Sequence, residues 1–87
     1  MNYAVIWLPL AIDQLAEAWR TSVNRNAVTA ASHNIDMALG TDPYGFGESR
    51  EGNERIGFEP PLNVLYRVVK EDRHVYVISI HSYARRR

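Results

Sequence analysis

The sequence contains no cysteine. Disulfide bonds and thiolate metal sites are therefore excluded, and since small secreted domains usually depend on disulfides, we expect a cytoplasmic protein. The three histidines, at positions 33, 74 and 81, do not have the spacing of metal ligands,. The glycines at 45, 47 and 52 follow a predicted helix, whereas a dinucleotide fingerprint follows a strand,. We therefore predict neither a metal nor another cofactor.

Long hydrophobic runs are also missing. The apolar stretch over residues 4–12 is interrupted by Pro9, and it is far shorter than the ~20 residues that a membrane-spanning helix needs. No basic residue precedes it, so it does not resemble a targeting segment,. We read it as a buried strand that leads into a helix and expect no membrane partner.

The formal net charge is zero, because 10 basic residues balance 10 acidic ones. The two signs are unevenly distributed along the chain. Residues 1–60 carry four basic and eight acidic side chains, and residues 61–87 carry six basic and two acidic ones. Such asymmetry can orient a protein toward an anionic partner, although it is a weaker signal than a high overall pI.

The remaining pattern predicts one α+β domain over residues 1–87, a length suited to a single hydrophobic core,. Apolar residues at spacings of three and four predict an antiparallel helical hairpin over residues ~10–22 and ~25–39, which Gly40 ends. The glycine-rich residues 40–53 read as a loop. β-Branched and aromatic runs predict strands over residues 3–8, 54–59, 62–69 and 74–82. The order is β-α-α-β-β-β, with the hairpin packed on a small, mostly antiparallel, four-stranded sheet.

Side-chain alternation along the strands predicts which face of the sheet the helices cover. We expect Trp7, Trp19 and the all-apolar strand faces to be buried, and His33 to be exposed. The mixed faces should form an open polar surface. The residues expected in the core are Leu62, Val64, Tyr66, Val68, Tyr76, Ile78, Ile80, Ile56 and Phe58, and those expected on the open surface are Arg55, Asn63, Arg67, Ser79, His81 and Tyr83.

Five stretches of the chain resemble the RelE/ParE toxin superfamily, and their order and spacing over some 80 residues carry the resemblance. The stretches are Trp7-x-Pro9-x-Ala11-x-x-x-Leu15-x-x-x-Trp19, Ile35-Asp36-x-x-Leu39-x-x-Asp42-Pro43, Pro61-Leu62-x-Val64-Leu65-Tyr66-Arg67-Val68, Val75-x-Val77-Ile78-x-Ile80-His81, and the basic tail Ala84-Arg85-Arg86.

The resemblance implies a toxin of a type II toxin–antitoxin module, neutralised by a cognate antitoxin from a neighbouring gene. RelE-like members cleave mRNA on the ribosome, whereas ParE-like members inhibit DNA gyrase and are not nucleases. Where the nuclease group usually has an arginine near the central-strand tyrosine, this chain has Asn63. Where the YoeB group has its C-terminal catalytic histidine, it has Tyr83, with His81 two residues earlier. An inactive toxin-like domain that only binds its partner is a third reading.

If the protein is a ribonuclease, the candidates for catalysis are His81, Tyr83 and Arg67, and the candidates for RNA or phosphate binding are Arg55, Asn63, Arg85 and Arg86. An imidazole titrates near neutral pH, and a guanidinium binds phosphate bidentately. A structural alternative exists for each. The histidine and tyrosine could be surface residues, the strand arginines could pair with Glu54 or Glu59, and the basic tail could be solvated.

Overall fold

The computed structural model describes residues 2–83. The predicted Ala84, Arg85 and Arg86 of the basic tail lie outside the described residues. The elements are β1 (Ala4–Trp7), α1 (Pro9–Thr21), α2 (Arg25–Thr41), α3 (Pro43–Phe46), β2 (Glu48–Ser49), β3 (Glu54–Glu59), β4 (Leu62–Val69), the 3₁₀ turn η1 (Lys70–Asp72) and β5 (His74–Ser82). The α+β class and the bounds of the last three strands are confirmed.

The strands form one mixed sheet in the order β1-β5-β4-β3-β2. β1 pairs with β5 in parallel, and the other pairs are antiparallel. Residues 2–83 contain five strands rather than the predicted four, because the segment predicted as a loop contains the two-residue strand β2 as well as α3. The mostly antiparallel sheet is otherwise as expected.

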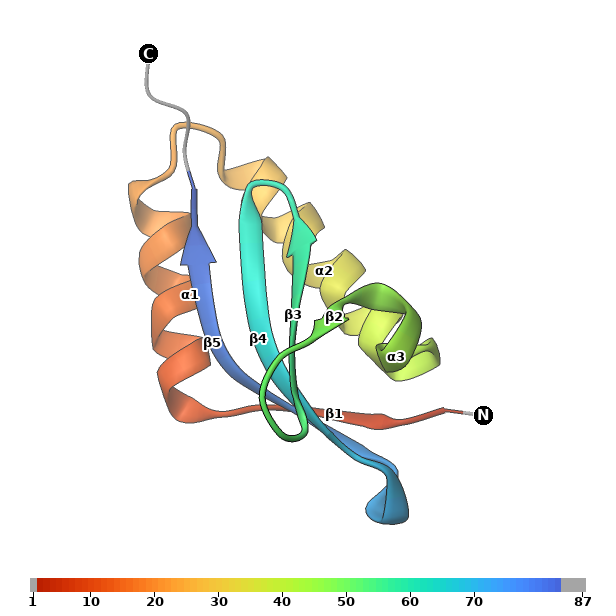
Figure 1. Ribbon diagram of the computed structural model, residues 1–87. Coiled ribbons are helices and arrows are strands. Elements are labelled where there is room, and N and C mark those ends of the chain that lie inside the picture. Colours follow the sequence, from red (N-terminus) through yellow and green to blue (C-terminus); the bar gives the residue numbers. More distant parts are fainter. Residues whose placement is uncertain (1, 84–87) are drawn as a thin grey trace.

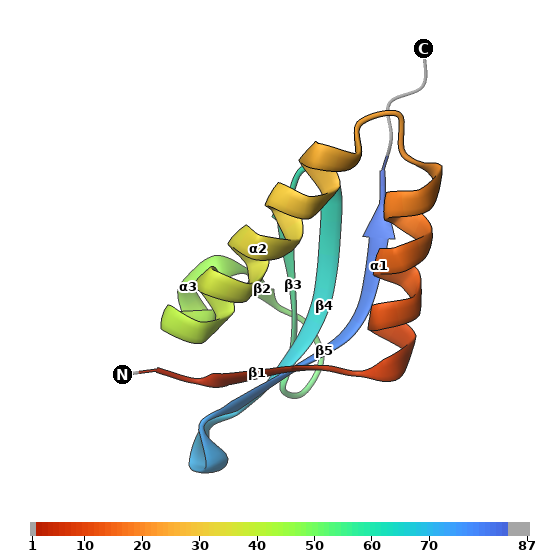
Figure 2. The same ribbon diagram turned by 180° about the vertical axis from the view of Figure 1, so that it is seen from behind.

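Both long helices cover one face of the sheet and leave the other face open. The strands lie in front of α2 in Figure 1, and α2 lies in front of them in the reverse view of Figure 2. The α1–α2 turn, the β3–β4 turn and the end of β5 all lie at the same end of the molecule. The core between the layers consists of Ala11, Ala18, Val28, Ala31, Ile35, Leu39, Leu62, Val64, Tyr66, Val68, Val75, Val77 and Ile80.

The second helix does not end at Gly40, contrary to the prediction, and continues to Thr41. Pro43 explains the true end, because a proline disfavours the helical conformation of the residue before it. That residue, Asp42, has φ −150° and ψ 76°. Its backbone amide donates to the Ala38 carbonyl oxygen at 2.8 Å, and its carboxylate accepts from the Gly45 amide at 3.1 Å. Asp42 therefore closes α2 and opens α3.

The last strand carries an irregularity that changes which of its side chains face the helices. Tyr66 lies opposite Val77 and Leu65 lies opposite Ser79, so Ile78 has no partner in the register. An extra residue of this kind is a β-bulge, and it reverses the alternation beyond it. Ile80 is buried as predicted, but Val75 and Val77 occupy the core in place of Tyr76 and Ile78, which are half-buried. The predicted face of Tyr76 is therefore wrong, and Ile78, at the bulge, is half-buried rather than part of the buried core.

The first helix contacts the sheet through small side chains. Ala11 and Ala18 are its buried residues, whereas Ile12 is 52% exposed and Trp19 is 44% exposed. The Gln14 side chain accepts a hydrogen bond of 2.7 Å from the Ile80 amide, on the part of β5 that β1 does not reach. The helix thus lies close against the edge of β5, and its larger apolar residues are displaced toward α2. The prediction that Trp19 lies in the core is therefore wrong. Trp7 is partly buried against the core, and His33 is exposed as predicted.

Candidate functional site

The open face of the sheet is arranged in three rows across β3, β4 and β5, because residues directly opposite each other in the register share a face. The first row is Phe58, Asn63 and His81, with Tyr83 just after β5; the second is Ile56, Leu65 and Ser79; the third is Glu54, Arg67 and Tyr76. We call these residues the open face. Ile56 and Phe58 belong to it, so their predicted burial in the core is wrong.

The first row combines two exposed aromatic rings with an amide and an imidazole. The rings of Phe58 and Tyr83 meet edge to face, with their centroids 6.4 Å apart. His81 and Tyr83 are exposed, and Asn63 is half-buried between its two neighbours in the row. The structure thus brings together three of the predicted site residues, namely His81, Tyr83 and Asn63.

Arg67 lies two rows away from His81. It lies four positions after Asn63 on β4, a distance of about 13 Å along a strand,. One of its guanidinium nitrogens, Nη2, lies 3.6 Å from the Glu54 carboxylate. Arg67 is on the predicted face, but it does not converge with the imidazole on a single small site.

Arg55 lies on the opposite face from His81, contrary to the prediction. It is opposite the buried Tyr66 in the register. Its Nη2 atom donates to the carbonyl oxygens of Tyr44 at 2.8 Å and Gly47 at 2.7 Å, and its guanidinium lies 5.4 Å from the centre of the Tyr44 ring. Arg55 therefore holds the segment containing α3 against the sheet, and it is not available to the open face.

The side of Arg55 follows from the strand bounds. With β3 ending at Glu59 and β4 starting at Leu62, the two-residue connection places Glu59 opposite Leu62, and the antiparallel register then places Arg55 opposite Tyr66. Directly opposite residues share a face. The expected register of β3 with β4 would therefore have predicted the correct face for Arg55, whereas the apolar alternation within β3 alone did not.

Tyr66 is fully buried between the sheet and the helices, as predicted, but its hydroxyl also has a role that the sequence did not indicate. Its hydroxyl donates to the Pro43 carbonyl oxygen at 2.6 Å, and its ring lies 6.0 Å from that of Phe46. Burial raises the pKa of the Tyr66 phenol above 10.0, and the neighbouring Arg55 opposes part of that rise. A neutral, fully buried phenol anchors α3 and cannot reach a substrate on the open face.

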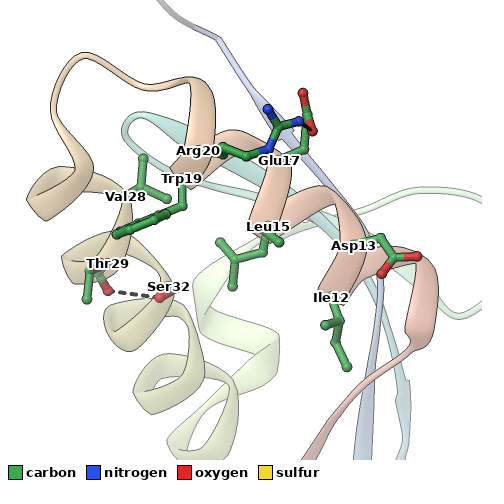
Figure 3. Close-up of a pocket in the computed structure, with 10 residues that line it drawn as sticks. Ile12, Asp13, Leu15, Glu17, Trp19, Arg20, Val28, Thr29 and Ser32 are labelled. Carbon is green, nitrogen blue, oxygen red and sulfur yellow. Dashed lines mark hydrogen bonds and ion pairs between the residues drawn. The ribbon is translucent and has the colours of Figure 1, made fainter.

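A second surface lies between the two long helices. It is a groove of about 570 Å³, which we call the hairpin groove, and its apolar lining includes Ile12, Leu15, Trp19 and Val28. Figure 3 shows Leu15 and Trp19 extending from α1 toward α2. The Arg25 guanidinium lies 4.6 Å from the centre of the Trp19 ring and so covers part of it. An open apolar concavity of this size is typical of a binding site.

The border of the hairpin groove carries charges of both signs. Asp13 and Glu17 lie along it, and Arg20 beside them is already paired with Glu17. A shallower continuation reaches Asp36, whose carboxylate accepts from the Trp7 indole nitrogen at 3.0 Å. Asp13 and Asp36 are the carboxylates here that could meet a basic residue of a partner with an apolar stripe.

Among residues 2–83, no three histidine or carboxylate side chains lie together in a way that could hold a metal ion. Over the same residues, no helix has both the length and the apolar character needed to cross a bilayer.

The chain is similar in structure to several solved proteins, although its sequence identity with them is low. No protein-family model and no curated protein sequence matches the chain. The toxin–antitoxin complex RelBE2 of Mycobacterium tuberculosis matches with a TM-score of 0.77 and 17% identity, covering 94% of this chain and 99% of that chain. The ParDE system of P. aeruginosa matches with a TM-score of 0.72 and 12% identity, covering 95% and 98%.

The isolated E. coli RelE toxin also matches, with a TM-score of 0.66 and 16% identity, over 97% of this chain and 87% of that one. These three likenesses extend over nearly the whole of each chain, so they concern the complete arrangement of helices and strands rather than a shared fragment. The chain therefore has the RelE/ParE toxin fold.

Proposed function

We propose that this protein is the toxin of a type II toxin–antitoxin pair and acts in the cytoplasm. The observation that carries the proposal is the likeness of fold over nearly the full length of structures described as toxin–antitoxin proteins. The two surfaces of the molecule suit this role. The hairpin groove can hold a protein partner, while the open face, on the other side of the sheet, remains free for a cellular target.

Within this role we propose ribosome-dependent cleavage of mRNA as the activity. The 2′-hydroxyl oxygen attacks the adjacent phosphorus, the bond to the 5′ oxygen breaks, and the products are a 2′,3′-cyclic phosphate and a 5′-hydroxyl. One group must take the hydroxyl proton and another must supply a proton to the leaving oxygen. His81 is the group for one proton transfer, because it is exposed and an imidazole can both accept and donate a proton,.

The remaining residues have supporting roles in this proposal. Tyr83 orients the sugar or contributes the other proton, and Asn63 binds the backbone beside His81. Arg67, about 13 Å from that row, contacts a neighbouring phosphate rather than the scissile one,. Arg85 and Arg86, which follow Tyr83 in the sequence, supply positive charge to the RNA,.

Inhibition of DNA gyrase without nuclease activity is the second candidate. The observation that favours it is the distribution of positive charge. The formal net charge is zero, Arg67 is paired with Glu54, and Arg55 lies on the other face of the sheet. A protein that binds ribosomal RNA ordinarily presents many unpaired cationic groups to the phosphate backbone.

For the partner, we propose that an antitoxin from the neighbouring gene binds the hairpin groove with an amphipathic segment whose apolar residues meet Ile12, Leu15 and Trp19. An apolar groove between helices is a common docking site for such a segment. Asp13, on the border of the groove, favours a basic residue in one flank of that segment,.

One expression experiment tests the function and separates its two mechanisms. The full chain is induced in bacteria with and without the product of the neighbouring gene, and protein synthesis and plasmid supercoiling are followed in parallel. We expect growth arrest with rapid loss of protein synthesis and unchanged supercoiling, reversed by the neighbouring product. A loss of supercoiling with slower effects on synthesis identifies the gyrase mechanism, and unimpaired growth contradicts the toxin role.

A further inference from the structure

An exposed phenylalanine stands out in the first row of the open face. Phe58 has 55% of its surface exposed, and Tyr83 beside it has 44% exposed. The two rings contact each other edge to face and leave aromatic surface accessible to solvent. Exposing such a ring is unfavourable in water, and the contact with Tyr83 leaves more than half of Phe58 uncovered. A ligand with a flat apolar surface of its own would cover the remainder.

The neighbours of the two rings indicate what kind of ligand this is. Asn63 lies directly opposite Phe58, and His81 lies directly opposite Asn63. Neighbouring strands are about 4.8 Å apart, so the row places an amide and an imidazole within about 10 Å of the Phe58 backbone. An amide both donates and accepts hydrogen bonds, as the edge of a nucleobase requires.

Charge favours a nucleic acid over a protein on this row. The first row of the open face contains no carboxylate, and the carboxylates on this face are Glu48, opposite Ile56 at the end of the second row, and Glu54 in the third. The sequence continues from Tyr83 through Ala84 to Arg85, Arg86 and Arg87, and arginines suit a phosphate backbone,. The hairpin groove differs from this row, because its lining is mainly apolar.

We propose that Phe58 and Tyr83 form a stacking platform for one unpaired base of a single-stranded RNA, with Asn63 binding the edge of that base. The proposal deepens the ribonuclease function and rests on it. Aromatic side chains bind unpaired bases by stacking. The platform holds the base of a nucleotide while its ribose and phosphate extend along the row toward His81. Phe58 is thus a positioning residue that helps to decide which phosphate is presented to the imidazole.

Two oligonucleotide probes can separate the contribution of base stacking to binding from the contribution of electrostatic attraction to phosphate. One probe is a fluorescent 2′-O-methyl RNA pentamer, which lacks the 2′-hydroxyl needed for cleavage. The other is the same pentamer with an abasic central nucleotide and an unchanged number of phosphates. Loss of one stacked base weakens binding about 5- to 150-fold. We therefore expect the wild-type full chain to bind the intact probe at least about fivefold more tightly, by fluorescence anisotropy.

Variants of Phe58 assign that preference to the platform. Phe58→Ala should bind both probes with equal affinity, while Phe58→Tyr should keep the preference. Tyr44→Ala is the matched control, because Tyr44 has the same 44% exposure as Tyr83 but lies on α3. Thermal unfolding of every variant establishes that it is folded. Salt should weaken both probes alike and leave their ratio unchanged, since stacking involves no phosphate.

Three results would overturn the platform: equal affinity of the wild type for both probes, a preference that survives Phe58→Ala, or loss of antitoxin binding by Phe58→Ala with the preference intact. The toxin function is tested separately by the expression experiment. A protein that discriminates the two probes but leaves protein synthesis untouched contradicts the ribonuclease function while the platform stands.

Discussion

Tyr66 shows how a single buried hydroxyl can hold a segment that has little regular structure. Its donated hydrogen bond to Pro43 is 2.6 Å long, and both residues are buried. A Cβ atom on Gly47 would lie 2.7 Å from the same hydroxyl oxygen, and one on Gly57 would overlap the Phe46 ring. The two glycines therefore let α3 and the chain after it pack directly on the sheet around Tyr66.

We predict that Tyr66→Phe lowers the free energy of unfolding by about 1–3 kcal/mol at pH 7, because it leaves the Pro43 carbonyl oxygen without its buried donor,. The wild type should also lose stability in alkali. Burial raises the folded-state pKa of Tyr66, so above pH 10.0 the unfolded chain loses this proton first and stability falls as pH rises,.

Urea unfolding at several values between pH 7 and pH 11 measures both effects. The decline in alkali should be smaller in Tyr66→Phe than in the wild type, and Tyr44→Phe, which alters an exposed phenol, serves as the control. If Tyr66→Phe is as stable as the wild type at pH 7, the hydrogen bond to Pro43 is not the anchor described above.

His81 is the residue whose replacement separates a catalytic open face from a purely binding one. We predict that His81→Ala slows cleavage of ribosome-bound mRNA about 10²- to 10⁴-fold, as is typical when one proton-transfer group is removed. Its exposure means that folding should be unaffected. Arg67→Ala should have a smaller effect, because Arg67 is paired with Glu54 and lies two rows away.

His33→Ala is the control for this measurement, since His33 is an exposed histidine on α2, outside the open face. A wild type that cleaves, together with a His81→Ala variant that loses less than tenfold in rate, would falsify the proton-transfer role. The residue would then belong to the binding surface.

At the scale of the elements, α2 depends on a local signal at its start. Asn24 has a non-helical backbone, and its side-chain oxygen accepts from the Ala27 amide at 3.1 Å. The same helix presents its apolar stripe of Val28, Ala31, Ile35 and Leu39 fully to the sheet, as predicted. The cap determines where the helix begins, and burial of the stripe supplies most of its stability.

We predict that Asn24→Ala destabilises the protein by about 1 kcal/mol, the usual effect of losing an N-terminal cap, and that Asn24→Gly costs only a few tenths. Asn26→Ala is the matched control, since Asn26 is an exposed asparagine inside the first turn. Chemical denaturation of the three variants tests this. Equal stability of Asn24→Ala and the control would contradict the capping role.

At the scale of the whole molecule, the sheet separates two surfaces of different character. The hairpin groove lies on the helical side, and the open face lies on the other (Figures 1 and 2). A change in the groove should therefore affect the antitoxin without reaching His81. This separation predicts a toxin variant that its own antitoxin no longer controls.

We predict that Ile12→Lys weakens antitoxin binding at least tenfold and leaves toxicity unchanged, because it places a charge in the apolar lining that the apolar residues of the antitoxin meet. Ile12 is 52% exposed, so the fold should tolerate the change. Met37→Lys adds the same charge at a residue of α2 that is 58% exposed and does not line the groove.

The measurements are calorimetric titration with the purified antitoxin and growth after induction of both genes. Growth arrest that the antitoxin relieves in Met37→Lys but not in Ile12→Lys supports the groove as the docking site. Equal relief in both variants places the antitoxin elsewhere, and Leu65→Glu on the open face then tests the other surface.

The sequence by itself determined the class of fold and most of its elements. The bounds of the last three strands match because alternating β-branched residues and short polar or proline-containing connections are local signals that survive folding,. The buried stripe of α2 matches for a similar reason, since its spacing is that of one helix face,. The open face was predicted in part, with Asn63, Arg67, His81 and Tyr83 on it.

Only the tertiary structure decided the remaining features, because they depend on how the strands pair with one another and how the helices pack on the sheet. The bulge at Ile78 arises from the pairing of β5 with β4. Because of it, Val75 and Val77 are buried in the first half of β5 in place of the predicted Tyr76 and Ile78. Pairing with Tyr66 took Arg55 to the helical side, and pairing with β3 made a strand of Glu48–Ser49. The apolar stripe of α1 was visible in the sequence, but the close approach of α1 to β5 decided that alanines would be buried and that Ile12 and Trp19 would line a groove.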